Sequence, residues 1–113
     1  MNGRLKNAAV ALSNTNLTAV YTVPTNFTAI VKDIFLTNVD GTSAVDATLK
    51  YTDTSASATF SLVSTKSVPA DDFLRIEDAN IFLEEGDILK AQAGAANDLE
   101  VTVFVEEIYK PQG

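Results

Sequence analysis

Four groups of neighbouring acidic residues are the side chains in this sequence that could do acid–base chemistry. They are Asp71-Asp72, Glu77-Asp78, Glu84-Glu85-Asp87 and Glu106-Glu107. Two carboxylates can act as general acid and general base only when both reach one substrate. Adjacent residues on a strand point to opposite faces, and most of these groups fall at expected turns, where solvated acids are common. We therefore expect no catalytic residue among them.

Two oxygen-rich segments could in principle hold a calcium ion. The first contains Asn38, Asp40, Thr42 and Asp46, and the second is Glu84–Asp87. Neither has the spacing of a calcium-binding loop, which ends on a bidentate acid at its twelfth position. The sequence therefore favours no metal site and no cofactor.

Histidine and cysteine are both absent from the 113 residues. This absence excludes Cys/His zinc sites, Ser-His-Asp and Cys-His nucleophiles, and disulfides within these residues. Carboxylate chemistry survives the exclusion, but the absence makes an enzyme a weaker hypothesis. We expect a protein that is not an enzyme.

The charge pattern disfavours nucleic acid and membrane as partners. Eight basic residues stand against 15 acidic ones, for a net charge of −7. The basic residues are scattered, apart from the Arg4–Lys6 pair, whereas a nucleic-acid surface needs a basic stripe. No apolar run reaches the roughly 18 residues of a membrane span, and the short AAVAL run does not suit a secretory signal peptide.

Aromatic side chains could stack on sugars. The chain has six phenylalanines and three tyrosines (Tyr21, Tyr51 and Tyr109), but no tryptophan. At least five of these nine fall at core-facing positions of expected strands. Packing in a core or interface is therefore favoured, and glycan binding is the alternative.

These side chains must be positioned by strands, because helical periodicity is almost absent and short Val- and Thr-rich runs recur between turn residues. We expect strands near 7–12, 17–23, 27–38, 44–52, 58–65, 71–77, 80–92 and 99–109. About eight short antiparallel strands at this spacing predict an all-β, single-domain, jelly-roll-like β-sandwich. A helix over residues 92–97 is a weaker alternative.

Specific residues explain the breaks between these strands. Pro24 cannot donate to a ladder and ends the second strand. Asp40-Gly41 suits a turn with positive φ. Glu85-Gly86-Asp87 should break the seventh element in a tight turn, with Gly86 in a conformation that a side chain would resist.

Alternation along two strands predicts which residues face the core. In the last strand these are Leu99, Val101, Val103 and Val105, and in the fourth they are Val45, Ala47, Leu49 and Tyr51. The other face of the last strand carries Glu100, Thr102, Phe104, Glu106 and Ile108. That face mixes charge with large apolar groups, so it is not a plain solvent face.

Strand 27–38 is apolar on both faces. Regular alternation places Phe27, Ala29, Val31 and Phe35 on one face and Ile30, Ile34 and Leu36 on the other. An exposed patch of this size would be a liability on a monomer. We expect a neighbouring subunit to cover it, with an interface of Ile30, Ile34, Leu36, Phe104 and Ile108. Burial inside an uneven sandwich is the alternative.

Two segments of the sequence resemble the small β-rich structural proteins of tailed bacteriophages. They are YTVPTNFTAIVKDIFLTN and ILKAQAGAANDLEVTVFVEEI, and the matching parts cover Tyr21–Asn38 and Leu83–Ile108, about half of the chain. The resemblance implies a virion component assembled in the host cytoplasm. Head decoration (cement) proteins, tail or neck accessory proteins and fibre segments all show this pattern.

The resemblance further implies a decoration protein that binds the major capsid protein as a homo-oligomer, with a homotrimer as the expected form. We expect a sandwich domain over residues 17–113, preceded by residues 1–16 as an N-terminal arm or a first strand. In the arm alternative, Arg4, Leu5 and Lys6 would contact the capsid by adding a strand to an exposed edge. A tail or neck accessory protein, or a host-surface (glycan) binding module, is the alternative function.

Overall fold

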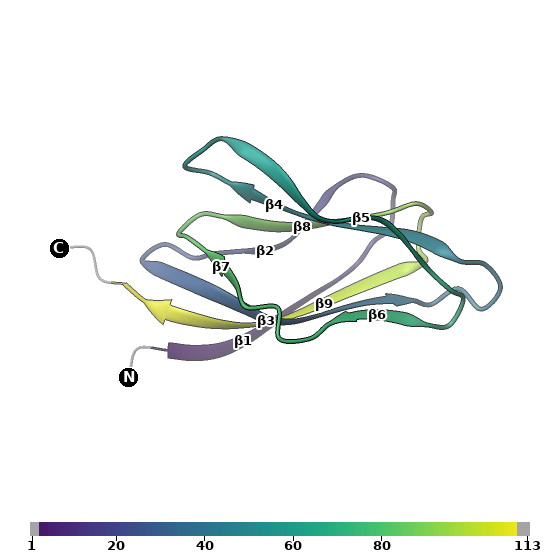
Figure 1. Cartoon of the computed structure of the whole chain (residues 1–113), viewed down its shortest axis with the longest axis horizontal. Coiled ribbons are helices and arrows are strands. Elements are labelled where there is room, and N and C mark those ends of the chain that lie inside the picture. Colours follow the sequence, from purple (N-terminus) through teal and green to yellow (C-terminus); the bar gives the residue numbers. More distant parts are fainter. Residues whose placement is uncertain (1–2, 111–113) are drawn as a thin grey trace.

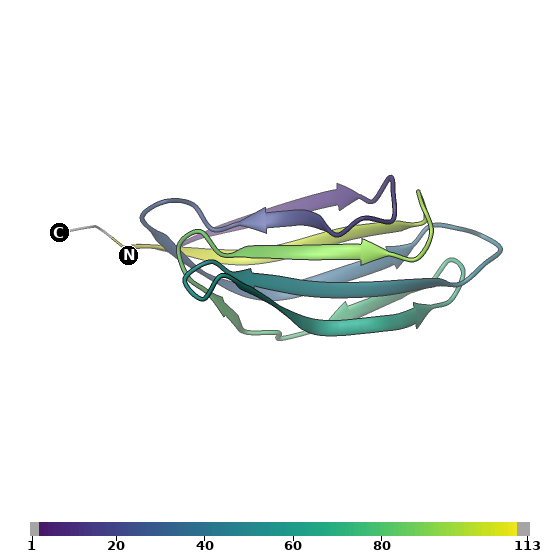
Figure 2. The same ribbon diagram turned by 90° about the horizontal axis from the view of Figure 1, so that it is seen from above.

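A computed structural model describes residues 3–110 as two antiparallel sheets packed face to face (Figure 1, Figure 2). Sheet A consists of β1 (Gly3–Ala11), β3 (Phe27–Asn38), β6 (Phe73–Ile76), β7 (Ile81–Leu83) and β9 (Leu99–Tyr109). Sheet B consists of β2 (Thr18–Thr22), β4 (Val45–Asp53), β5 (Ala58–Val68) and β8 (Ile88–Ala93).

The strand order is that of a jelly roll. Sheet A runs β1-β9-β3-β6, with β7 also paired to β3, and sheet B runs β2-β8-β4-β5. Most consecutive strands lie in opposite sheets, whereas β4 and β5 form a hairpin within one. The predicted fold class is confirmed. Residues 92–97 are not helical, and within residues 3–110 no helix is long and apolar enough to cross a membrane.

The core lies between the two sheets and is built from alternate residues of their strands. Leu99, Val101, Val103 and Val105 of β9 are at most 2% exposed, as predicted. Val45, Ala47 and Leu49 of β4 are also buried, and Tyr51 is half-buried against the same core. Each fully buried leucine or valine side chain contributes about 1.5–3 kcal/mol through the hydrophobic effect.

The backbone conformation predicted for two turns is confirmed at Gly86 and wrong at Asp40-Gly41. Gly86 lies between β7 and β8 with φ +84°, a conformation that resists a side chain. Asp40 and Gly41 do not have positive φ, so that prediction was wrong. Their loop is instead closed by the carboxylate of Asp40, whose Oδ1 accepts a hydrogen bond from the Thr42 amide at 2.9 Å.

The N-terminal segment lies in sheet A. β1 starts at Gly3, earlier than the expected strand at residues 7–12, because its register with β9 extends from Gly3–Ile108 to Ala11–Glu100. It forms one edge of the sheet and has β9 as its neighbour in the strand order.

A β-bulge at Lys32 changes which residues of β3 face the core. Val31 pairs with Val105 and Asp33 with Phe104, so Lys32 is an extra residue between two consecutive pairs. The alternation therefore reverses after Val31. Ile34 and Leu36 are fully buried between the sheets. Their predicted place at a subunit interface was wrong, because regular alternation was assumed through the whole strand.

Candidate interaction surface on the outer face of sheet A

Four of the six phenylalanines lie on the outer face of sheet A, away from the core. Cross-strand pairing places them there: Phe35 is level with Thr102, Phe73 with Thr37, Phe82 with Ile30 and Phe104 with Asp33. The bulge brings Phe35 to this face by reversing the alternation of β3. The same face carries Leu5, Ile30 and Ile108.

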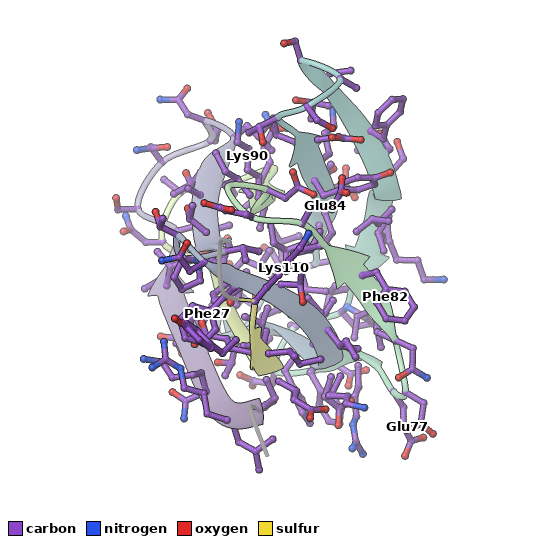
Figure 3. All side chains as sticks on the ribbon, turned by 90° about the vertical axis from the view of Figure 1, so that its left-hand side faces the viewer. Phe27, Glu77, Phe82, Glu84, Lys90 and Lys110 are labelled. Carbon is purple, nitrogen blue, oxygen red and sulfur yellow. The ribbon has the colours of Figure 1, made fainter. Side chains whose placement is uncertain are left out.

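Several of these side chains are unusually exposed for their size. Leu5 is 82% exposed, Phe82 77%, Phe73 53% and Phe104 40%. The Phe82 ring projects from β7 away from the body of the protein (Figure 3). Such a set of large apolar groups on one sheet face marks an interaction site more often than a solvated surface.

Three of the rings form a strip across the strands. The Phe35 ring centroid lies 5.8 Å from that of Phe73 and 6.1 Å from that of Phe104, the latter in an edge-to-face arrangement. Both distances fall within the range of favourable aromatic pairs. The three rings therefore support one another's positions within a single chain.

Four of the charged groups on this face form two ion pairs. Arg75 donates from Nε and Nη2 to the two carboxylate oxygens of Asp33, at 3.2 and 2.8 Å, and its guanidinium carbon lies 5.1 Å from the centre of the Phe35 ring. The hydrogen bonds from Arg75 hold the pKa of Asp33 below its usual value. Lys32 Nζ lies 3.8 Å from Glu106 Oε1. These pairs neutralise charge within one protomer.

The outer face of sheet B has a different composition. Its cross-strand pairs include Thr48–Gln92, Lys50–Lys90, Lys50–Ser61 and Thr52–Thr59, and Thr52 also pairs with the apolar Ile88. Such a polar face is ordinary for the solvated side of an antiparallel sheet. Phe60 and Leu62 of β5 are 47% and 38% exposed, but the larger set of exposed aromatic groups lies on sheet A, which makes its outer face the candidate interaction surface.

The structure separates the predicted interface residues into two sets. Ile30, Phe104 and Ile108 lie on the outer face of sheet A, and Ile34 and Leu36 lie in the core. Among the predicted arm residues, Leu5 is on the outer face, whereas Arg4 and Lys6 alternate to the other side of β1. Sequence reasoning missed Phe35, Phe73 and Phe82, since neither the bulge nor the strand order could be read from the sequence.

A buried charge network ties β1 and β2 to β9. Glu107 is 1% exposed, and its carboxylate accepts hydrogen bonds from the Tyr21 hydroxyl at 2.6 Å and from Arg4 Nε at 2.7 Å. The Arg4 guanidinium carbon also lies 4.3 Å from the centre of the Phe27 ring. Tyr21 and Arg4 thus provide both carboxylate oxygens with a donor.

The ionisation of this network suits a structural role. Burial raises the pKa of Glu107, but the hydrogen bonds from Tyr21 and Arg4 and the nearby positive charges outweigh it, so this pKa is lower than usual. Burial and the Glu107 carboxylate raise the pKa of Tyr21 well above its usual range. The acid stays ionised and the phenol stays protonated. The sequence predicts most of the acidic groups in turns. The alternation of Leu99, Val101, Val103 and Val105, continued by two residues, is the signal that places Glu107 on the core-facing side of the strand.

A second acidic cluster joins the loops at one end of the sandwich. Carboxylate oxygens of Asp53, Glu84 and Asp87 lie within 4.8 Å of one another. Asp87 accepts hydrogen bonds from the Thr54 amide and hydroxyl and from the Glu84 amide, at 3.1, 3.2 and 2.8 Å. The carboxylate of Asp87 thus orders two loops.

The other oxygen-rich segment also has a structural role. Asn38 is 1% exposed, and its side-chain amide donates to the carbonyls of Ser43, Val68 and Pro69 at 2.9, 3.0 and 3.2 Å. These hydrogen bonds hold the end of β3 to two loops. The side-chain nitrogen of Asn38 faces these carbonyls, so this contact is a structural one and not that of a calcium ligand. Its own Oδ1 accepts the Asp40 amide.

Solved structures with a similar fold come from several kinds of assembly. The chain is similar to a subunit of the Bacillus endospore appendages, disulfide-linked pili, with a TM-score of 0.58 and 10% identity over 97% of this chain and 90% of that one. It is similar to the Drosophila NLP core, described for pentamer formation and histone binding, with a TM-score of 0.56 and 9% identity over 92% and 97%.

A viral shell protein shows the same fold. The virus-like particle of the Macrobrachium rosenbergii extra small virus matches with a TM-score of 0.51 and 13% identity, over 99% of this chain and 82% of that one. At these identities the likeness concerns the fold alone. No protein-family model and no curated protein sequence matches the chain.

Proposed function

We propose that this chain is a non-enzymatic structural subunit of a virion, most specifically a head decoration (cement) protein that binds the capsid as a homo-oligomer. The observation that carries the proposal is the outer face of sheet A, where Phe73, Phe82 and Leu5 are each more than half exposed. A jelly roll with one polar and one aromatic outer face suits a subunit that assembles with others.

The resemblance to phage structural proteins supports this proposal. Its two segments, Tyr21–Asn38 and Leu83–Ile108, contain β3 and most of β9, which are neighbours in sheet A. Parts of the sequence that are far apart along the chain therefore form one sheet and one outer face. The fold is also one that subunits of a viral particle and of a pilus use, although these 113 residues contain no cysteine for a disulfide linkage like that of the pili.

The roles of the charged groups support a non-enzymatic function. Glu107, Asp87 and Asp33 each accept hydrogen bonds from protein donors that hold strands or loops together. Acids used in this way lock the backbone and are not arranged around a substrate-sized cleft. A rigid sandwich is what a reinforcing protein requires.

The physical task of a decoration protein is to link several capsid subunits against outward stress. Many modest contacts over a broad surface do this well, because each further contact is made at high effective concentration. We assign the capsid contact to the start of β1, at Arg4, Leu5 and Lys6, because β1 is an edge strand and edges accept additional strands. The resemblance implies a trimer as the oligomer.

The number of copies in each particle tests this function. We expect quantitative mass spectrometry of purified virions to find hundreds of copies of this protein per particle, in fixed proportion to the major capsid protein. A handful of copies would favour the tail or neck alternative. Absence from virions, or clear hits on a glycan array with purified protein, would contradict the proposal.

A further inference from the structure

The outer face of sheet A has the area of one side of a stable interface. β3 and β9 are 12 and 11 residues long, which is about 40 Å at the usual rise of a strand. The molecule is 20 Å across the strands (Figure 2). The face therefore covers about 800 Å², the area that each partner contributes to a standard protein–protein interface.

The charge on this face permits contact with an identical copy. The whole chain has a net charge of −7, which opposes self-association. On the outer face, however, Lys32 and Arg75 balance their partners Glu106 and Asp33. These four groups are already paired, so they need no counter-charge from elsewhere. Glu100 of β9 is exposed on the same face and adds one negative charge from each copy.

Side-chain size changes across two adjacent rows of the face. Each row crosses the strands in the order β6, β3, β9, β1. The first row is Arg75, Phe35, Thr102 and Ala9, and the adjacent row is Phe73, Thr37, Glu100 and Ala11. In these two rows the aromatic groups lie on β6 and β3 and the alanines on β1, whereas elsewhere on the face Phe104 lies on β9 and Leu5 on β1. A shallow groove of about 250 Å³ follows the small side, lined by Ala9, Val10, Ala11, Glu100, Val101 and Thr102.

We propose that a second copy of this chain packs face to face on the outer face of sheet A, about a two-fold axis that runs along the strands between β3 and β9. This axis places β6 of one copy over β1 of the other, because the order β1-β9-β3-β6 is reversed by the rotation. Phe73 of each copy then enters the alanine groove of its partner. In these two rows each aromatic group meets a small one, and such self-complementarity is what an isologous interface requires.

The inference rests on the homo-oligomer part of the proposed function and specifies its contact. It assigns the outer face of sheet A, including the outward side chains of β1, to a second copy and leaves the outer backbone edge of β1 for the capsid. A two-fold pair also differs from the trimer that the resemblance implies, so the two can be distinguished by the mass of the particle in solution.

Sedimentation velocity of the purified full chain at about 1–100 μM tests the contact. The wild-type protein should sediment as a dimer over this range, which is the usual span for modest interfaces. Phe73→Ala, which removes the aromatic group, and Ala11→Phe, which fills the groove, should each weaken the dimer at least ~10-fold. The combined variant Phe73→Ala/Ala11→Phe exchanges the large and small groups and should recover most of the affinity.

The matched control is Leu62→Ala on β5 of sheet B. Leu62 is 38% exposed, close to the 40% of Phe104, but it lies on sheet B and outside the proposed interface. It should leave the dimer unchanged. Far-UV circular dichroism checks that each variant is folded, and Phe82→Ser on the highly exposed Phe82 replaces Phe73→Ala if that variant does not fold.

Three results would overturn the inference: a wild-type monomer at 100 μM, a trimer, or an exchange variant no tighter than the single variants. The copy count in virions is independent of these measurements. A dimer that is absent from virions would refute the proposed virion role and leave the interface standing. A monomer found in hundreds of copies would refute the interface and the homo-oligomer, and would leave the virion role standing.

Discussion

Glu107 occupies a core-facing position of β9 and is charged nonetheless. Its burial is tolerated because Tyr21 and Arg4 supply hydrogen bonds to both carboxylate oxygens. Removing one partner from a buried charge costs more than the interaction contributes, since the remaining oxygen loses its solvation without replacement. At the scale of a single residue, the network therefore fixes the edge strand β1 and the short strand β2 to the centre of sheet A.

Replacing Tyr21 by phenylalanine should destabilise the protein by about 2 kcal/mol, because one oxygen of Glu107 then lacks its donor. Urea denaturation at neutral pH measures this change. Tyr51→Phe is the matched control, since within residues 3–110 the structure gives the Tyr51 hydroxyl no hydrogen bond, and it should change the stability by less than about 0.5 kcal/mol. Equal effects of the two substitutions would contradict a special role for the Tyr21 hydroxyl.

The bulge in β3 decides the character of both faces of sheet A. One extra residue, Lys32, turns Ile34 and Leu36 into the core and brings Phe35 to the outer face. It also directs Asn38 inward, where its amide holds two loops. At the scale of an element, the exposed aromatic strip and the closed core therefore depend on the same irregularity.

Deleting Lys32 should prevent stable folding. Without the extra residue, Ile34, Leu36 and Asn38 would rotate to the solvent face and Phe35 into the core, because a one-residue shift reverses every side chain beyond it. Far-UV circular dichroism and thermal denaturation report the loss. The control deletion of Ala44, an exposed residue just before β4, shortens a loop and should leave a folded protein with a measurable transition. A stable, cooperatively folded Lys32 deletion would refute the role of the bulge.

The whole molecule combines an acidic composition with one face on which four charged groups form two ion pairs. Its net charge is −7, yet the outer face of sheet A pairs its central charges internally. Acidic groups elsewhere keep a concentrated protein soluble, whereas the ion pairs on the outer face of sheet A permit a specific contact with a second copy. Both layers of the sandwich are visible edge-on in Figure 1, with sheet A below and sheet B above.

Salt should strengthen self-association. Two copies of net charge −7 repel one another, and this long-range repulsion is reduced when the Debye length falls from about 30 Å at 0.01 M to about 8 Å at 0.15 M. Sedimentation velocity at these two salt concentrations should show a dimer that is several-fold tighter at the higher one. Tighter association at low salt would instead indicate that ion pairs across the interface dominate.

Local pattern predicted a large part of this structure. Strands 27–38 and 99–109 have the predicted bounds, and the break at Gly86 is where the turn residues placed it. These features depend on neighbours in sequence: alternation sets the faces of β9, and glycine permits the φ of its turn. The acidic composition and the absence of histidine and cysteine are likewise fixed by the sequence, and they exclude Cys/His zinc sites and nucleophile pairs that use histidine or cysteine within these residues.

The candidate surface depended on tertiary structure. The bulge arises from the pairing of β3 with β9, which lie far apart in the sequence, so no local signal marked Lys32 as the extra residue. The strand order then gathered Phe73 of β6, Phe82 of β7 and Phe104 of β9 on one face. Sequence alone determined that the chain forms a two-layer β protein with more large apolar groups than its core can hold. Only long-range pairing decided which of them are left outside.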